Sequence, residues 1–251
     1  MIDVLLALPL GLAIGLALGG MGGGGSILAV HLLVYALGFT PHQATAASLI
    51  IVGSAAVLGG ISHARAGRID VRTAALFAGF AIPGAIAGAF ANNAVSGRLL
   101  LTGFAILLLI AAWMMRRGTR SRESASHNRT VPRTIFVGLG TGVLTGFFGV
   151  GGGFLIVPAL VLVLGVPIAN AVGTSLIVIT VASIAALAVH VTAVHIPWAV
   201  TAAFAATAML GALLGTRLAK DATPRRLTNL FATLAVAVAA FLLAANLPAS
   251  L

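Results

Sequence analysis

The sequence predicts an all-α polytopic membrane protein made of two inverted-topology repeats, each a glycine-turn helical hairpin followed by three transmembrane helices. Three observations lead to this prediction. Of the 251 residues, 60% are hydrophobic and only 7% are charged, whereas a soluble domain carries about 25% charged residues. Several apolar segments reach the ~20 residues that cross a bilayer. The second half of the chain repeats the first half at a constant offset.

The distribution of charge excludes other classes of protein. The net charge is +10, but the 14 Lys and Arg residues lie between or beside the apolar segments, as in loops that face an anionic membrane surface. This pattern argues against a nucleic-acid-binding protein. The chain has no cysteine, so it forms neither a disulfide nor a thiolate metal site. Its first residues carry no basic cluster, so we expect the start of a membrane helix there rather than a cleaved signal peptide.

A shift of 127 residues superimposes the sequence on itself. Between residues 11 and 50, 17 of 40 positions are identical to residues 138–177 without a gap. The register persists to the end of the copy, where Arg98 meets Arg225. We therefore divide the chain into a first membrane repeat at 1–115, a cytoplasmic linker at 116–132 and a second membrane repeat at 133–251.

Each repeat divides into five apolar segments. They are predicted at about 4–20, 26–38, 42–64, 72–92 and 97–115 in the first repeat, and at about 133–148, 153–165, 170–192, 198–218 and 225–246 in the second. The last three of each set are long enough to span. The second segment is too short to cross fully. We expect the first two segments, joined by a glycine turn, to form a re-entrant hairpin or a pair of short helices.

The basic residues define the predicted topology. In the first repeat they cluster between the third and fourth segments, at Arg65, Arg68 and Arg72, whereas in the second repeat they cluster between the fourth and fifth. An odd number of crossings per repeat inverts the second copy and places 13 of the 14 basic residues on the cytoplasmic side. A parallel duplication would leave four outside. The prediction is therefore an inverted repeat with both ends facing outward.

Two glycine runs form the predicted centre of function. Gly19–Ser26 and Gly146–Gly153 each join the first two segments of a repeat. Unpaired glycine backbone is costly in hydrocarbon, so such runs belong inside protein or along a wet cavity. Each run also opens a helix, whose free N–H groups and positive dipole end suit an anion. Inverted symmetry would bring the two turns together near the middle of the membrane.

The third segment of each repeat begins with polar residues. Their hydroxyl groups, together with the amide of Gln43, are neutral hydrogen-bond donors beside a second helix N-terminus. The candidate substrate-binding residues are Gly23, Gly24, Gly25, Ser26, Ser48, Gly151, Gly152, Gly153, Thr174 and Ser175. For the polar side chains the alternative is helix capping or hydrogen bonding between helices. For glycines spaced four apart, such as Gly11 and Gly15, the alternative is close helix packing.

Three histidines are candidates for a gate or a proton-linked role. His31 lies inside the second segment, opposite Pro158 of the second copy, and an ionisable side chain at this depth is a functional candidate. His63 and His190 are equivalent in the repeat and lie near the ends of the third segments. The alternatives are a neutral, hydrogen-bonded ring for His31 and snorkelling to the surface for the other two.

The acidic residues narrow the substrate class. Asp3, Asp70, Glu123 and Asp221 all lie at segment ends or in loops. A cation would lack a carboxylate partner within the span, so we expect a small anionic substrate in a protein surrounded by lipid, with no metal and no other cofactor. No catalytic residue is assigned. One alternative is an intramembrane hydrolase that uses Ser26, although the sequence lacks the Gly-x-Ser-x-Gly elbow. A second alternative is a structural or assembly subunit of a membrane complex. The sequence is compatible with an oligomer.

Three motifs carry a family resemblance. They are the doubled Gly-xxx-Gly-xx-Gly-Gly-Gly hairpin, Pro158-xx-Val161 and the Gly173-Thr174-Ser175 step. In these the chain resembles the TauE/SafE sulfite exporter family over nearly its whole length, with the linker as the break. The resemblance implies a multi-pass inner-membrane transporter, an exporter or facilitator, of sulfur-containing anions such as sulfite, sulfoacetate or related organosulfonates.

Overall fold

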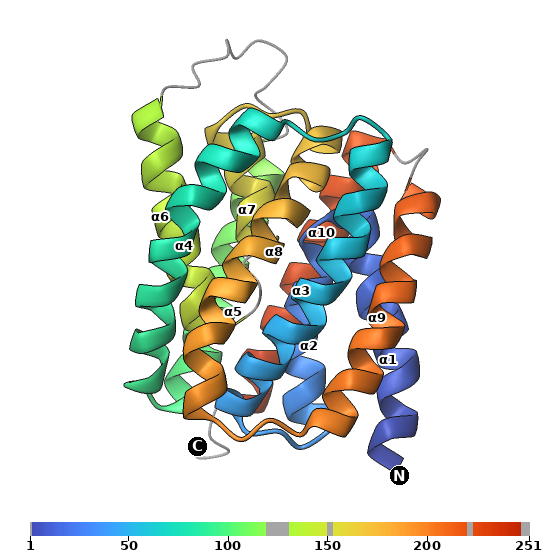
Figure 1. Ribbon diagram of the computed structural model, residues 1–251, viewed down its shortest axis with the longest axis vertical. Helices are drawn as coiled ribbons and strands as arrows, with labels where there is room; N and C mark the ends of the chain where they lie inside the picture. Colours follow the sequence, from blue (N-terminus) through green and yellow to red (C-terminus); the bar gives the residue numbers. More distant parts are fainter. Residues whose placement is uncertain (1, 119–130, 150–152, 220–222, 247–251) are drawn as a thin grey trace.

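The computed structural model describes residues 2–118, 131–149, 153–219 and 223–246. These residues form helices and no strand, so the predicted all-α fold is confirmed. The first half contains α1 (Ile2–Met21), α2 (Gly24–His31), the π-helical turn η1 (Leu32–Ala36), α3 (Pro41–Arg65), α4 (Val71–Asn93) and α5 (Gly97–Gly118). The second half contains α6 (Val131–Phe148), α7 (Gly153–Pro158), the π-helical turn η2 (Ala159–Val163), α8 (Ile168–Ala193), α9 (Trp198–Leu218) and α10 (Pro224–Asn246) (Figure 1).

Within the described ranges, seven helices are long and apolar enough to cross a membrane. They are α3, α4, α5, α6, α8, α9 and α10. Three further apolar stretches are shorter than 18 residues: Leu5–Met21 of α1, Gly25–Ala36 of the continuous α2–η1 helix and Gly153–Val163 of the α7–η2 helix. The molecule is therefore a multi-pass membrane protein, as its composition predicts.

The ten predicted segments each lie on a helix, and the differences at their ends have local causes. Helix α3 begins at Pro41 because Thr40 and Gln43 form a capping box, in which each side chain accepts the other residue's backbone N–H, at 3.3 and 3.1 Å. The capping alternative for Gln43 is thus confirmed. The second segment ends at Ala36 rather than near residue 38, because η1 stops there and Gly38 takes a left-handed φ of +68°.

Helices α3 and α8 lie side by side in the middle of the bundle (Figure 1). Helix α3 also packs on α9, and α8 packs on α4. The first helix of each half lies along the fourth helix of the other half, α1 on α9 and α6 on α4, while α5 pairs with α10. The two halves are therefore interleaved rather than set beside each other.

Glycines spaced four apart make the α1–α9 and α6–α4 contacts possible. A Cβ on Gly15 would lie 2.1 Å from the carbonyl oxygen of Ala208, and one on Gly142 would lie 2.3 Å from that of Ala81. Both glycines and both partners are 127 residues apart, so the two contacts are equivalent in the repeat. Close helix packing, the alternative for these glycines, is confirmed.

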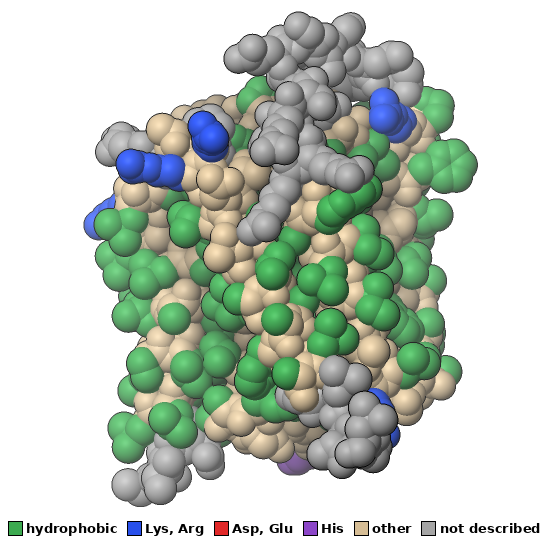
Figure 2. Space-filling model, turned by 180° about the vertical axis from the view of Figure 1, so that it is seen from behind, with side chains coloured by type: hydrophobic (Ala, Val, Ile, Leu, Met, Phe, Trp, Pro, Cys, Tyr) green, Lys and Arg blue, Asp and Glu red, His purple; other side chains and the backbone are tan. Residues whose placement is uncertain are grey.

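The connections are distributed over the two ends of the bundle. In Figure 1 the α3–α4 connection and the end of α9 lie at the top, whereas the α8–α9 and α4–α5 connections, the start of α1 and the end of α10 lie at the bottom. The α3–α4 connection carries the basic cluster around Arg68. Figure 2 shows Lys and Arg near the ends of the face that it displays, with a hydrophobic or uncharged surface between them, as a membrane-embedded belt requires.

Candidate transport site at the glycine turns

The two glycine turns meet inside the bundle. A Cβ on Gly23 would lie 1.9 Å from the carbonyl oxygen of Gly153, so the backbones touch with no side chain between them. Each turn also carries a left-handed glycine, Gly22 with φ +72° and Gly149 with φ +64°. Gly23 and Gly153 come from opposite halves of the chain, so the two halves are in direct backbone contact at this junction. Gly151 and Gly152, predicted for the same site, lie outside the described residues.

The start of α2 presents backbone donors at this junction. Gly23 occupies the N-cap position and supplies no side-chain acceptor. The N–H groups of the first helical turn have no acceptor within the helix, and this turn holds the predicted residues Gly24, Gly25 and Ser26. Gly25 and Ser26 are buried. In general, a helix N-terminus with free amide donors and a positive dipole end is suited to binding a small anion.

The hydroxyls of the predicted site hold the backbone of the turns in this conformation. Ser26 donates to the carbonyl of Gly23 at 2.7 Å. Ser48 of α3 donates to the carbonyl of Gly149, in the turn of the other half. Ser175 of α8 lies equivalently against Gly22 and donates to the carbonyl of Val172 at 2.7 Å. Ser26 and Ser48 therefore bond the backbone of the glycine turns, whereas Ser175 bonds within its own helix and packs against Gly22.

Thr174 lies apart from that arrangement. Its hydroxyl accepts the backbone N–H of Asp70 at 3.0 Å, which joins α8 to the start of α4. Gly173, beside it, packs against the carbonyl of Arg68 and the Cβ of His63. The sequence step Gly173-Thr174-Ser175 thus reaches both the glycine turn and the α3–α4 connection.

His63 and His190 make equivalent contacts. The Nε2 of His63 donates to the carbonyl of Gly19 at 3.2 Å, and that of His190 donates to the carbonyl of Gly146, also at 3.2 Å. Both rings are buried, with 3% and 0% exposure. Snorkelling, one alternative for these residues, is therefore wrong. Both imidazoles point into the protein, where each bonds the carbonyl of a glycine.

His31 is buried beside the aromatic side chains near the junction. Its Nδ1 donates to the carbonyl of Ile27, one turn earlier in α2. Its ring lies 5.3 Å from that of Phe104 on α5, which also contacts Phe154 of α7 at 5.1 Å. The hydrogen-bonded ring expected as the alternative for His31 is thus present. Within the described residues neither His31 nor Ser26 hydrogen-bonds to the other, so no nucleophile–base pair supports the hydrolase alternative.

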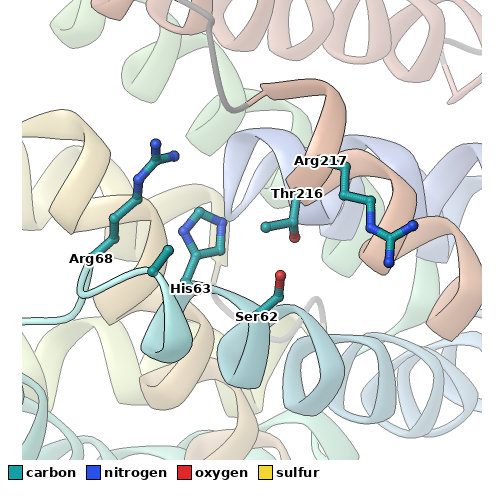
Figure 3. Close-up of a pocket in the computed structure, with 6 residues that line it drawn as sticks. Ser62, His63, Arg68, Thr216 and Arg217 are labelled. Atoms are coloured by element: carbon teal, nitrogen blue, oxygen red, sulfur yellow. The ribbon is translucent and has the colours of Figure 1, made fainter.

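A cavity of about 190 Å³ lies close to this site, at the end of the bundle that holds the α3–α4 connection. It is lined by Ser62, His63, Ala66, Arg68, Thr216 and Arg217 (Figure 3). Sequence reasoning assigned the two arginines to membrane topology alone and did not select Ser62 or Thr216. Their association depends on a tertiary contact between the ends of α3 and α9, for which the sequence contains no local signal.

The interleaved apolar helices, the buried glycine junction and the polar cavity define the class of a multi-pass membrane transporter. The chain matches the sulfite exporter TauE/SafE family over residues 7–242, and it belongs to that family. A probable membrane transporter protein of Xylella fastidiosa strain Temecula1 is 37% identical over 239 residues, covering 92% of this chain and 91% of the relative. The probable membrane transporter protein YdhB of Bacillus subtilis is 31% identical over 173 residues, covering 66% of this chain and 70% of the relative. No solved structure matches the chain.

Proposed function

We propose that this transporter carries small sulfur-containing oxyanions, such as sulfite, sulfoacetate or other organosulfonates, across the inner membrane by way of the two glycine turns. The observation that carries the proposal is the contact of Gly23 with Gly153 in the interior of the bundle. Backbone amides at such a junction bind negative charge without placing a fixed cation in the membrane. The substrate class is taken from the name of the family to which the chain belongs.

The charge distribution supports an anion rather than a cation. None of the seven helices long enough to span contains an Asp or Glu within its apolar stretch. A cation would therefore have no carboxylate partner there. With a negative interior, export of a monovalent anion gains about 2.3 kcal/mol per 100 mV, so export needs no coupled ion whereas uptake would.

An inverted repeat is part of the same proposal. Its support is the 127-residue register shared by the glycine contacts, the left-handed glycines and the histidine hydrogen bonds. The α3–α4 and α8–α9 connections, equivalent in that register, lie at opposite ends of the bundle. The basic α3–α4 end then faces the cytoplasm, by the positive-inside rule.

Efflux from proteoliposomes tests the proposal. Vesicles containing the purified protein are loaded with sulfite or sulfoacetate, and efflux is followed under an imposed membrane potential. We expect efflux with the wild type and a loss of most of it in Gly23→Ala, because the added Cβ would collide with Gly153. Gly140→Ala is the matched control, since a Cβ there meets nothing within 4 Å. Absence of flux for every sulfur oxyanion, or normal flux in a folded Gly23→Ala protein, would contradict the proposal.

A further inference from the structure

The polar cavity of Figure 3 has the features of an anion site that the glycine turns do not supply. Its volume of about 190 Å³ exceeds several-fold the ~30 Å³ share of one water molecule. It therefore has room for an oxyanion together with water. Ser62 and Thr216 approach from α3 and α9 with their hydroxyls pointing toward each other, and the imidazole of His63 lies beside them (Figure 3). The Thr216 hydroxyl donates to the carbonyl of Ala212 at 2.9 Å, so an anion here would have to take over that donor or rely on Ser62.

His63, which lines the cavity, also carries a buried polar atom without a hydrogen-bond partner among the described residues. Its side chain is 3% exposed, and its Nε2 is committed as a donor because the Gly19 carbonyl only accepts. Its Nδ1 has no hydrogen-bond partner among the described residues. Buried polar atoms of proteins nearly always have one. The Nδ1 can accept a ligand O–H or, when the ring is protonated, donate to a ligand oxygen.

Two arginines give the cavity its charge. Arg68, half-buried in the α3–α4 connection, and Arg217, exposed near the end of α9, extend on either side of the hydroxyl pair (Figure 3). The nearby carboxylate of Asp70 does not line the cavity; it accepts the backbone N–H of Thr73 at 3.1 Å and caps α4. Guanidinium groups are the side chains best suited to oxyanions.

The repeat contains an internal comparison. His190 occupies the position equivalent to His63, makes the same bond to a glycine carbonyl and also has an Nδ1 without a partner in the described part of the chain. An unpartnered Nδ1 is therefore not the distinguishing feature. The other cavity residues differ: Ser62, Arg68, Thr216 and Arg217 correspond to Val189, His195, Ala89 and Phe90. Within the described residues, only the end with the α3–α4 connection combines the buried histidine with two arginines and two hydroxyls.

The geometry points to a second oxyanion site in this cavity, at the basic end of the transport pathway, where Arg68 and Arg217 hold the anion on its way to or from the glycine turns. His63 connects the two places, since it bonds Gly19 three residues before the left-handed Gly22. The inference rests on the proposed function only for the identity of the anion. The site lies at the α3–α4 end of the bundle and has no equivalent at the other end among the described residues. An anion that enters from the α3–α4 end therefore meets this site first, whereas one that enters from the other end does not.

Binding to the detergent-solubilised protein tests the inference. The probes are sulfite, kept free of oxygen, and sulfate, and the readout is calorimetric affinity together with the ligand-induced rise in melting temperature. We expect Arg217→Gln and His63→Gln each to weaken binding by about tenfold. The Gln amide in His63→Gln preserves a donor for Gly19. The matched control Arg98→Gln should bind as the wild type does.

Arg217 is exposed, so Arg217→Gln remains informative if His63→Gln fails to fold. Wild-type affinity in folded Arg217→Gln and Arg68→Gln proteins would overturn the inference. A lipid phosphate headgroup has the same chemistry as a free oxyanion, so short-chain phosphatidylglycerol is titrated in a second arm. Binding of that lipid with no binding of sulfite or sulfate would also overturn it.

The outcome is separable from that of the flux experiment. Arginine-dependent binding without flux would leave the cavity site standing and remove the proposed transport function. Flux of sulfite with binding that is indifferent to Arg68 and Arg217 would remove the cavity site and leave the transport function standing.

Discussion

Gly149 and Gly38 share a left-handed backbone but differ in their surroundings. Both have a φ above +60°, yet a Cβ on Gly38 would meet nothing within 4 Å, whereas one on Gly149 would lie 1.9 Å from a methyl carbon of Thr45. Backbone strain and crowding can therefore be measured separately. From the sequence alone, Thr45 is one of several polar residues at the start of a third segment, and its contact with Gly149 depends on tertiary packing between the two halves.

Gly38→Ala should lower the free energy of unfolding by about 1–2 kcal/mol, the cost of a left-handed alanine. Gly149→Ala should lower it by a further ~1–3 kcal/mol, because the new methyl group also overpacks the site. Unfolding in detergent micelles, followed by circular dichroism, measures both. Equal losses would show that Thr45 yields freely and that the turn is not tightly enclosed.

Ser48 gives a second prediction for single residues. Its hydroxyl has two acceptors, the Gly149 carbonyl of the other half and the Thr45 carbonyl of its own helix at 2.9 Å. Ser54, two turns further along α3, donates only to Ile51 within the helix, at 3.0 Å. Ser48→Ala should lower the free energy of unfolding by about 1 kcal/mol or more, since a buried carbonyl loses a donor. Ser54→Ala should lower the free energy of unfolding by less, because the Ile51 carbonyl that loses this donor still takes part in the hydrogen bonds of the helix. A larger loss for Ser54→Ala would contradict the bracing role of Ser48.

The helices themselves were accessible from the sequence because their signals are local. Apolar length, glycine spacing and the Thr40–Gln43 cap lie within single segments, and the structure has helices at all ten places. The cavity was not accessible, because Ser62 and Thr216 are separated by most of the chain. The same holds for the hydroxyl of Thr174, whose partner Asp70 lies 104 residues away.

Helix packing supplies a prediction at the scale of elements. Gly15→Ala should weaken the α1–α9 contact, because its Cβ would press on the Ala208 backbone, which cannot move aside as a side chain can. We expect a loss of about 1–3 kcal/mol in the free energy of unfolding. Gly140→Ala, in open space on α6, should instead be neutral or stabilising through its better helix propensity. The same unfolding measurement compares them, and equal stabilities would contradict the tight α1–α9 contact.

Topology is a property of the whole molecule, and the chain is well suited to its measurement because it contains no cysteine. Ala66 and Ala193 are equivalent in the repeat, and both are exposed at the ends of their helices. In an inverted repeat, Ala66→Cys should react with a membrane-impermeant maleimide only from the cytoplasmic side and Ala193→Cys only from the opposite side. Labelling of both from the same side would rule out the inversion.

The exchange of first helices between the halves limits how this protein can be divided and how it can move. Helix α1 depends on α9 for the surface that its glycines fit, and α6 depends on α4 in the same way. A fragment ending at Gly118 would contain α1 without α9 and α4 without α6, so both glycine-lined helix surfaces would lack their partners. If the bundle opened between α3 and α8, α1 would move together with α9 on one side, and α6 together with α4 on the other. Each of the two moving bodies would therefore contain helices from both repeats.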